Sequence, residues 1–165
     1  MAENHIEEAE KIGVKVCVIV TSDTFTAETD TTGKLLVSVI EKSGFEVLDK
    51  EVVANDRALI EAMVGQKTQI ADVIIITGGT GISKKDYSVD TLKPMFEKDI
   101  PGFGEKLRLA GFEQIGERAL LSRACAGTIN HTLIFCIPGT LNAAETALKI
   151  IVPLLKHAVY ELKHK

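Results

Sequence analysis

Short apolar runs alternate along the chain with longer runs whose apolar residues recur at helical spacing. Three of the short runs are almost unbroken in β-branched and aliphatic residues, which is typical of strands buried on both faces. They are residues 14–20 (VKVCVIV), 71–76 (ADVIII) and 132–137 (TLIFCI). Between the first two, one helical face is formed by Leu35, Leu36, Val39 and Ile40. Strands that alternate with helices predict βαβ units and an α/β fold with a mostly parallel sheet.

The remaining segments predict further elements of both kinds. We expect a short helix over residues 2–11, a strand over 45–53, helices over 91–98 and 104–110, and another strand over 120–126. Asn55 or Asp56 can cap a helix whose apolar stripe is Leu59, Ile60, Met63 and Val64. A last helical repeat runs from Ala144 to Leu162, and Pro153 interrupts it.

In an open parallel sheet, ligands bind beyond the carboxyl ends of the strands. That rule selects four loops, which are residues 21–33, 53–57, 77–88 and 138–140. The third loop begins TGGTGISKKD and has three glycines within four residues, Gly78, Gly79 and Gly81. Glycines adopt positive φ and bring bare main-chain N–H groups to an anion, and Thr77 and Thr80 add hydroxyl donors. The loop therefore predicts phosphate binding, with an ordinary glycine turn as the alternative.

Charged residues at the end of this loop suggest a metal ion. Asp86 lies five residues beyond Gly81, and Mg²⁺ is typically held by one or two carboxylates together with phosphate oxygens. Lys84 and Lys85 can neutralise charge that builds up during phosphoryl transfer. A solvated turn explains the same Lys-Lys-Asp triplet without any ligand.

Other polar residues fall on the same predicted edge. Candidates for ligand contact are Ser22, Asp23, Ser122, Arg123, Pro138 and Gly139. Asp30, Asn55 and Asp56 are explained as helix caps. A cap and a ligand contact are compatible, because helix N-termini attract phosphate.

Composition and missing motifs exclude several function classes. The net charge is −4 with no basic block, so a nucleic-acid footprint is missing and an anionic ligand must be held by local donors or a metal ion. None of the four histidines has metal-ligand spacing with another histidine or a cysteine. The sequence also lacks a P-loop, a Rossmann glycine pattern and a nucleophile elbow.

The chain has no segment that suggests a membrane or a secretory route. No window approaches about 18 uninterrupted apolar residues, and the acidic start lacks the layout of a secretory signal. We expect a cytoplasmic protein with an N-terminal helical extension over residues 1–12 and a single domain over 13–165. The three cysteines are an odd number and form no CxxC pair. Cys17 and Cys136 lie in apolar runs, which indicates that these two are reduced and buried.

Five short motifs occur in an order that identifies a family. They are TGGTG followed by KD, DTTG at 30–33, PGFGE at 101–105, LSR at 121–123 and IPG at 137–139. Together they resemble the MoaB/MogA family of molybdenum cofactor biosynthesis, which includes the G domains of gephyrin and plant Cnx. The resemblance runs from about Val14 to the C-terminal helix. Residues 111–116 and the compact length are more similar to MoaB than to MogA.

The resemblance implies a three-layer α/β/α fold that commonly assembles as a trimer and works with other cofactor-biosynthesis proteins. It implies binding of molybdopterin, a pterin with a dithiolene and a terminal phosphate. Active members of the family adenylylate that phosphate with Mg·ATP and release pyrophosphate, ahead of molybdate or tungstate insertion.

The family's functional aspartates are matched only in part. The position of the first aspartate is occupied by Asp86, which follows Lys85 in place of the usual arginine. The position of the second is occupied, in strict register, by Asn55, and Asp56 comes next. The resemblance therefore implies catalytic roles for Asp86, Asp56, Asn55 and Lys85, and Mg²⁺ ligation by Asp86 and Asp56.

Two alternatives stay open. An asparagine can ligate through its carbonyl but brings no negative charge, so a non-catalytic trimer that binds a pterin or nucleotide is compatible with Asn55. A different transferase or hydrolase on the same fold, such as the nucleotide-processing domain of CinA-type proteins, is the third interpretation, and nothing after the domain supports it.

Overall fold

A six-stranded sheet forms the middle layer of the molecule in the computed structural model, which describes residues 2–164. The strand order is β2-β1-β3-β6-β5-β4. The strands are β1 (Lys15–Thr21), β2 (Glu46–Val53), β3 (Val73–Thr77), β4 (Lys98–Asp99), β5 (Cys125–Ile129) and β6 (Thr132–Ile137). The first four strands in this order are parallel, and β5 and β4 pair antiparallel at one edge. The predicted α/β fold with a mostly parallel sheet is confirmed.

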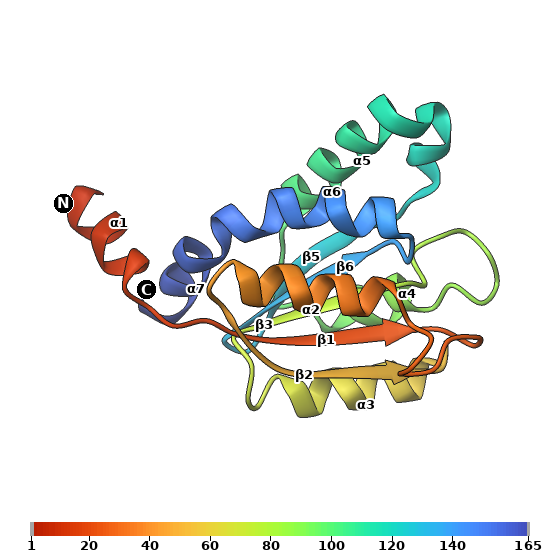
Figure 1. Cartoon of the computed structure of the whole chain (residues 1–165), viewed down its shortest axis with the longest axis horizontal. Coiled ribbons are helices and arrows are strands. Elements are labelled where there is room, and N and C mark those ends of the chain that lie inside the picture. The colour runs from red at the N-terminus through yellow and green to blue at the C-terminus, as the bar shows by residue number, and fades with distance from the viewer. Residues whose placement is uncertain (1, 165) are drawn as a thin grey trace.

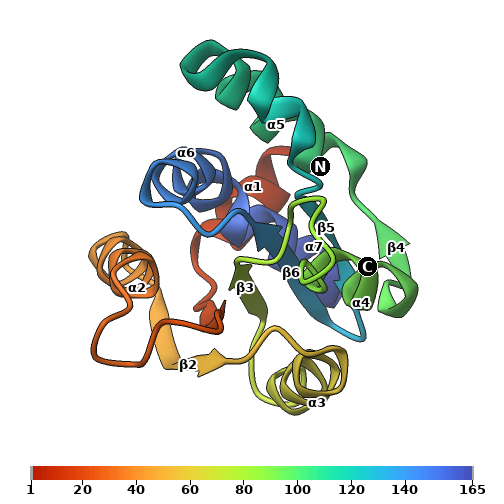
Figure 2. The same ribbon diagram turned by 90° about the vertical axis from the view of Figure 1, so that its right-hand side faces the viewer.

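Helices cover both faces of this sheet (Figures 1 and 2). The helices are α1 (Ala2–Glu10), α2 (Thr32–Lys42), α3 (Arg57–Lys67), α4 (Ser88–Leu92), α5 (Pro101–Ile115), α6 (Leu141–Ile151) and α7 (Leu155–His164). Three short 3-10 segments are η1 (Lys93–Met95), η2 (Gly116–Leu121) and η3 (Val152–Leu154). One core cluster joins the sheet to α2, α5, α6 and α7, and the other joins it to α3 and α4. The result is a three-layer α/β/α arrangement.

The side chains of β1 show why its apolar run is nearly continuous. Val16, Val18 and Val20 belong to one core cluster, whereas Cys17 and Ile19 belong to the other. Successive strand residues point to opposite faces, so a strand covered on both sides needs apolar residues at every position. The central strands β3 and β6 are buried along their whole length for the same reason.

The structure corrects several predicted elements. Residues 120–126 are not one strand, because Gly116–Leu121 is a 3-10 segment and β5 begins at Cys125. The helix predicted over 91–98 spans only Ser88–Leu92, and Pro94, which has no N–H to donate, lies in the 3-10 turn that follows. The helix predicted over 104–110 extends over Pro101–Ile115.

The buried apolar face of α3 is also narrower than predicted. Ile60 and Val64 are buried, but Leu59 is 50% exposed, because a neighbour in sequence points about 100° away around a helix. The interruption predicted at Pro153 is confirmed, since η3 separates α6 from α7.

The four parallel strands end at one edge of the sheet, to the right in Figure 1. The two ends of the chain lie on the opposite side, where α1 and α7 pack together. Loops 22–31, 54–56, 78–87 and 138–140 follow the parallel strands, so the four predicted ligand-binding loops meet at this edge. We call it the carboxyl edge.

Candidate functional site

The glycine loop that follows β3 is fixed to three neighbouring segments by main-chain hydrogen bonds. Gly78 N donates to Ile137 O of β6 at 2.9 Å, and Ser88 N at the start of α4 donates to Gly79 O at 3.1 Å. Arg123 N, just before β5, donates to Thr80 O at 2.9 Å. The loop is therefore held in one conformation at the carboxyl edge.

Two positions in the loop require glycine for both conformation and space. Gly78 has φ 101° and Gly79 has φ 69°, a region that side chains with a Cβ atom rarely adopt. A Cβ atom on Gly78 would lie less than 3.0 Å from Thr21 O, and one on Gly79 less than 3.0 Å from Ser88 Oγ. The end of β1 and the start of α4 thus press against a bare backbone. Of the three glycines, Gly78 and Gly79 adopt the positive φ that the sequence allows, and Gly81 does not.

Three consecutive donors of this loop remain available. Within residues 2–164, the main-chain N–H groups of Gly79, Thr80 and Gly81 make no hydrogen bond to another residue. Such groups normally bond to protein, water or a ligand. Consecutive N–H groups in a glycine-rich turn form the concave anion sites known as nests. This part of the loop can therefore bind a phosphate group.

Asn55 lies directly against the loop. Its Oδ1 atom is buried without a hydrogen-bond partner, and a Cβ atom on Gly79 would lie 3.1 Å from it. The Asn55 N–H donates to Asp23 Oδ1 at 2.9 Å, which holds the β2–α3 loop to the β1–α2 loop. A buried acceptor without a partner costs about 1–3 kcal/mol, so Asn55 Oδ1 is a candidate atom for contact with a ligand or cation.

Asp56 is used differently from its neighbour. Its side chain accepts a hydrogen bond from Leu59 N at 3.0 Å and caps α3, which confirms one of the two predicted caps. Asn55, rather than Asp56, therefore occupies the place beside the glycine loop. The predicted metal role of Asp56 is untested, and its carboxylate is engaged in the cap.

Asp86 closes the far end of the glycine loop. Its Oδ2 atom accepts from Ser83 N at 2.8 Å, and its own N–H donates to Ser83 O at 3.1 Å. A Cβ atom on Gly81 would lie 2.7 Å from the same carboxylate oxygen, so Asp86 packs against the loop it closes. Lys84 and Lys85 next to it are exposed.

Arg123 binds the loop from the side of β5. Its Nε donates to Gly81 O at 2.9 Å and its Nη2 to Asp86 O at 3.3 Å. The same guanidinium binds both carboxylate oxygens of Asp90, at 2.8 and 2.9 Å. Hydrogen bonding from Arg123 lowers the pKa of Asp90 from its ordinary value, and Asp90 in turn raises the pKa of Arg123. The predicted phosphate contacts of Arg123 and Ser122 stay predictions, since these bonds are all to protein.

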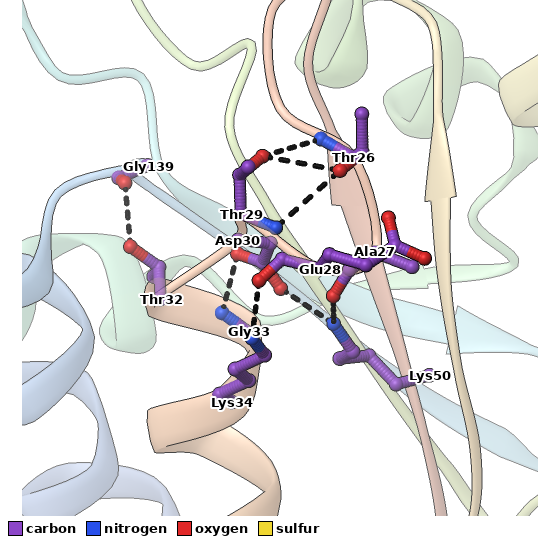
Figure 3. A network of polar contacts seen from close by, with 10 residues as sticks. All are labelled: Thr26, Ala27, Glu28, Thr29, Asp30, Thr32, Gly33, Lys34, Lys50 and Gly139. Carbon is purple, nitrogen blue, oxygen red and sulfur yellow. Dashed lines mark hydrogen bonds and ion pairs between the residues drawn. The ribbon is translucent and has the colours of Figure 1, made fainter.

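The loop after β1 is organised around a buried carboxylate (Figure 3). Asp30 is 1% exposed, and its Oδ1 accepts from Gly33 N at 2.9 Å in the first turn of α2. Its Oδ2 pairs with Lys50 Nζ at 2.8 Å, and Thr32 Oγ1 donates to Gly139 O at 3.1 Å. Asp30 is thus a structural anchor that ties α2 to β2, while Thr32 ties α2 to the loop after β6.

Ser22 and Asp23 also make local contacts at the carboxyl edge. Ser22 Oγ accepts from Thr24 N at 3.1 Å and Phe25 N at 2.9 Å, and therefore organises its own turn. Asp23 accepts from Asn55 N as described. A ligand contact by either residue stays a prediction.

Sequence reasoning did not find the contacts that hydroxyl groups make with the protein beneath the loop. Thr21 Oγ1 donates to Thr77 O at 3.2 Å and lies 3.3 Å from Ser88 Oγ. Thr77 Oγ1 donates to Pro138 O at 3.0 Å, so the predicted hydroxyl donor supports the loop after β6. Thr77 and Ser88 are fully buried. Nothing in the sequence indicates these contacts, because each joins segments that meet only in the folded sheet.

A cavity of about 340 Å³ opens beside the carboxyl edge between α5, η2 and α6. Its polar lining residues are Arg108, Gln114, Arg118, Ser122, Thr140, Asn142 and Thr146. Leu107, Ile115 and Ala119 supply apolar walls. This volume is in the range of small-molecule sites, and Ser122 and Thr140 connect it to the loops described above.

Comparison with known proteins identifies the family. The model of the family described as "Probable molybdopterin binding domain" matches residues 17–157. The chain belongs to this family of molybdenum cofactor biosynthesis proteins. The molybdenum cofactor biosynthesis protein B of Bacillus subtilis (strain 168) is 39% identical over 165 residues, which cover 98% of this chain and 96% of the relative. The resemblance to MoaB and MogA is therefore confirmed.

Solved structures of the family share the whole fold. A crystal structure of a molybdenum cofactor biosynthesis protein B is 35% identical and has a TM-score of 0.88, covering 93% of this chain and 98% of that chain. The tungsten cofactor synthesizing protein MoaB from Pyrococcus furiosus is 30% identical, with a TM-score of 0.83 and coverage of 92% and 98%. Among residues 2–164 there is no helix with the length and apolar character needed to cross a membrane.

Proposed function

We propose that this family member binds molybdopterin at the carboxyl edge and adenylylates its terminal phosphate with Mg·ATP, releasing pyrophosphate. The observation that carries the proposal is the set of unbonded N–H groups at Gly79, Thr80 and Gly81. A hydrogen bond from such a group to a phosphate oxygen is charge-assisted and contributes about 1.5–3 kcal/mol. Two or three of them offset the repulsion of an anion by a chain of net charge −4.

Magnesium is part of the proposal because two side-chain oxygens of the type that Mg²⁺ takes as ligands lie beside the glycine loop. Within the described chain, no group of three or more His, Cys, Asp or Glu side chains is arranged to hold a metal. Mg²⁺ keeps several waters, however, and is usually held by one or two carboxylates and by the phosphates of the substrate. Asp86 and the unpartnered Asn55 Oδ1 would supply one carboxylate and one neutral oxygen. When bound, the ion would withdraw charge from the phosphates.

In the proposed reaction, an oxygen of the terminal phosphate of molybdopterin attacks the α-phosphorus of ATP. The bond from that phosphorus to the leaving pyrophosphate breaks. A phosphate monoester has a second pKa of about 6, so the attacking group is largely a dianion at neutral pH and needs no general base. The residues of the chain then contribute alignment and charge, as in other phosphoryl transfers.

Roles for individual residues follow from this scheme. The loop N–H groups of Gly79 to Gly81 hold one phosphate, and Lys84 and Lys85 offset negative charge nearby. The cavity between α5 and α6, with a volume of about 340 Å³, has room for an organic ring. Gln114 and Asn142 in its wall bond to each other, and they would have to exchange that bond for a contact with the ring.

Release of pyrophosphate tests the proposal directly. The protein is incubated with molybdopterin, ATP and Mg²⁺, and pyrophosphate is measured against a reaction without protein. We expect release above that background, and a fall of about 100-fold or more in Asp86→Asn, which keeps an acceptor for Ser83 N–H but removes the charge. Asp99→Asn, an exposed aspartate on β4, is the matched control. No release by the wild-type protein would refute the enzymatic proposal.

A non-catalytic pterin-binding protein is the second candidate, and Asn55 is the observation that favours it. Asn55 lies beside the glycine loop without a negative charge, where the family resemblance implies an aspartate. In Asn55→Asp, a carboxylate replaces the neutral oxygen. Activity that arises only in this variant would identify the natural protein as the binder, whereas equal activity in both proteins would support the enzyme.

Assembly as a homotrimer is part of the same proposal. Helix α5 and η2 project from the rest of the molecule in Figures 1 and 2. They expose five large apolar side chains, which are Leu109, Phe112, Ile115, Leu120 and Leu121. Several exposed apolar side chains on one projecting segment support a contact with another protein. Sedimentation velocity should give a trimer for the wild type, and a purely monomeric protein would contradict this assignment.

A further inference from the structure

Two of the three cysteines lie opposite each other in the antiparallel part of the sheet. Strands β5 and β6 form a hairpin in which Ile129 pairs with Thr132, and the register places Cys125 directly opposite Cys136. Both belong to the core cluster beneath α3 and α4, so their side chains share one face of the sheet. The sequence does not indicate this pairing, because the two residues are separated by a turn and form no CxxC motif.

The register fixes which kind of ladder pair they form. Ile100 N donates to Ala126 O and Glu97 N donates to Thr128 O, both at 2.8 Å. The main-chain N–H and C=O groups of Ala126 and Thr128 therefore point away from β6, toward the β4 side. Cys125 and Gly127 alternate with Ala126 and Thr128 along β5, so their main-chain N–H and C=O groups point toward β6. Cys125 and Cys136 are therefore a hydrogen-bonded pair, whose Cα atoms are about 5.5 Å apart. Disulfides form across Cα separations of about 4.4–6.8 Å, a range that includes this spacing. They also need Cβ atoms about 3.5–4.5 Å apart, so the two strands must draw together slightly when the bond forms.

The two thiols also affect each other's acidity. A side-chain hydrogen bond with Cys136 lowers the pKa of Cys125, burial opposes this, and Lys93 and Arg108 lower it further. The same hydrogen bond and complete burial raise the pKa of Cys136. A thiolate is the nucleophile in thiol–disulfide exchange. Cys125 is 5% exposed and Cys136 is fully buried, so Cys125 is the sulfur that an external disulfide meets first.

The third cysteine serves as an internal comparison. Cys17 lies on β1, and β3 and β6 separate it from Cys125 on β5. Burial, and after it the neighbouring Asp49 carboxylate, raises the pKa of Cys17 to about 12. It is therefore a poor nucleophile at neutral pH and has no cysteine opposite it.

We propose that Cys125 and Cys136 form a reversible dithiol–disulfide site in the folded protein, oxidised by a low-molecular-weight disulfide such as oxidised glutathione. The Cys125 thiolate attacks one sulfur of that disulfide, which releases one thiol and leaves a mixed disulfide. Cys136 then loses its proton and attacks the Cys125 sulfur, which forms the S–S bond and releases the second thiol. Two protein thiols are oxidised and one external disulfide is reduced.

The two cysteines lie next to residues that hold the glycine loop, so a disulfide between them can affect that loop. Cys125 follows Arg123 by two residues, and Arg123 bonds to Thr80 O and Gly81 O. Cys136 precedes Ile137, whose carbonyl accepts from Gly78 N. A bond between the two sulfurs therefore joins the two strands that anchor this loop. This inference does not depend on adenylylation, since it concerns the chemistry of the thiols alone.

Peptide mapping of the native wild-type chain tests the proposal. The protein is equilibrated with mixtures of reduced and oxidised glutathione, free thiols are trapped by alkylation at acid pH after rapid unfolding, and the peptides are identified by mass. At oxidising ratios we expect one intramolecular bond between Cys125 and Cys136, with Cys17 fully alkylated. Dithiothreitol should restore three alkylated thiols, with the circular dichroism spectrum unchanged throughout.

Variants separate this outcome from non-specific oxidation. Cys17→Ala should still form the bond, whereas Cys136→Ala should stop at a mixed disulfide on Cys125. If Cys136→Ala does not fold, the proposal is judged from the peptide map of the wild-type protein. Three free thiols in the folded protein at the most oxidising ratio would overturn the proposal. A stable mixed disulfide in the wild type, or any bond that includes Cys17, would overturn it as well.

Discussion

Replacing Gly79 by alanine tests how tightly the glycine loop is built. The substitution places a Cβ atom at φ 69°, and that atom would lie less than 3.0 Å from Ser88 Oγ. Adopting this left-handed conformation costs a residue with a Cβ about 1–2 kcal/mol. Ser88 must also turn away and lose its contact with Thr21 Oγ1, a buried hydrogen bond that contributes about 0.5–1.5 kcal/mol. Gly79→Ala should therefore lower the free energy of unfolding by about 1.5–3.5 kcal/mol.

Two other glycines separate these contributions. Gly44 has φ 88°, and a Cβ atom added there would have no atom within 4 Å, so Gly44→Ala measures the conformational cost without the collision. Gly65 lies inside α3 with equally open space and no positive φ, so Gly65→Ala should stabilise the protein by about 0.5–1 kcal/mol. The difference between Gly79→Ala and Gly44→Ala is then the cost of displacing Ser88.

Urea unfolding is the suitable assay, followed by far-ultraviolet circular dichroism because the chain has no tryptophan. Binding of inorganic phosphate, measured on the same samples, reports whether the loop still presents its N–H groups. If Gly79→Ala and Gly44→Ala lose the same stability within about 0.5 kcal/mol, the collision with Ser88 does not occur and the tight packing of Gly79 against Ser88 is wrong.

The remaining predictions concern the charged anchors of the carboxyl edge. Asp30→Ala leaves Lys50 and Gly33 N–H without their partner, and we expect a loss of about 3 kcal/mol in urea unfolding, with the exposed Glu28→Ala unchanged as control. Arg123→Lys keeps the charge but loses the forked contacts to Gly81 O and Asp90, so amide hydrogen exchange across residues 80–90 should accelerate, and an unchanged exchange pattern would contradict the role given to Arg123. Because the pKa of Asp90 is lowered in the folded state, its stabilising contribution is complete above its ordinary pKa of about 3.9 and is lost as the pH falls through the folded value. The stability difference between wild type and Asp90→Asn should therefore shrink below about pH 4, and a difference that persists after Asp90 is protonated would refute this origin.

The sheet and the edge that carries the site could be predicted from the sequence, because both follow from local patterns. Val73 to Ile76 are rich in β-branched residues and end at a glycine loop, which together favour a short, fully buried strand followed by an open turn. The order of the strands and the family motifs agree with this interpretation. Local patterns fail where the chain is polar or short, as with η2 and β5, since Leu120 and Leu121 are exposed rather than part of a strand.

The contacts inside the site could not be predicted, because they depend on distances between segments far apart in the sequence. Asn55 and Asp56 have similar polarity, and only the folded loop shows that Asn55 faces Gly79 while Asp56 caps α3. Arg123 was a candidate ligand because of its charge, yet its guanidinium is engaged by Asp90, which the sequence did not mark. The pairing of Cys125 with Cys136 is likewise a property of the register alone.

Both ends of the chain emerge on the side of the molecule opposite the carboxyl edge (Figure 1). Lys156 Nζ holds the end of α1 through Glu10 O at 2.8 Å, and Lys163 pairs with Asp72 at the start of β3. An affinity tag, a fluorescent label or a linker to a solid support can thus be attached at either end with the glycine loop facing away from it. The molecule is well suited to surface-based binding measurements, in which orientation usually limits access to the ligand.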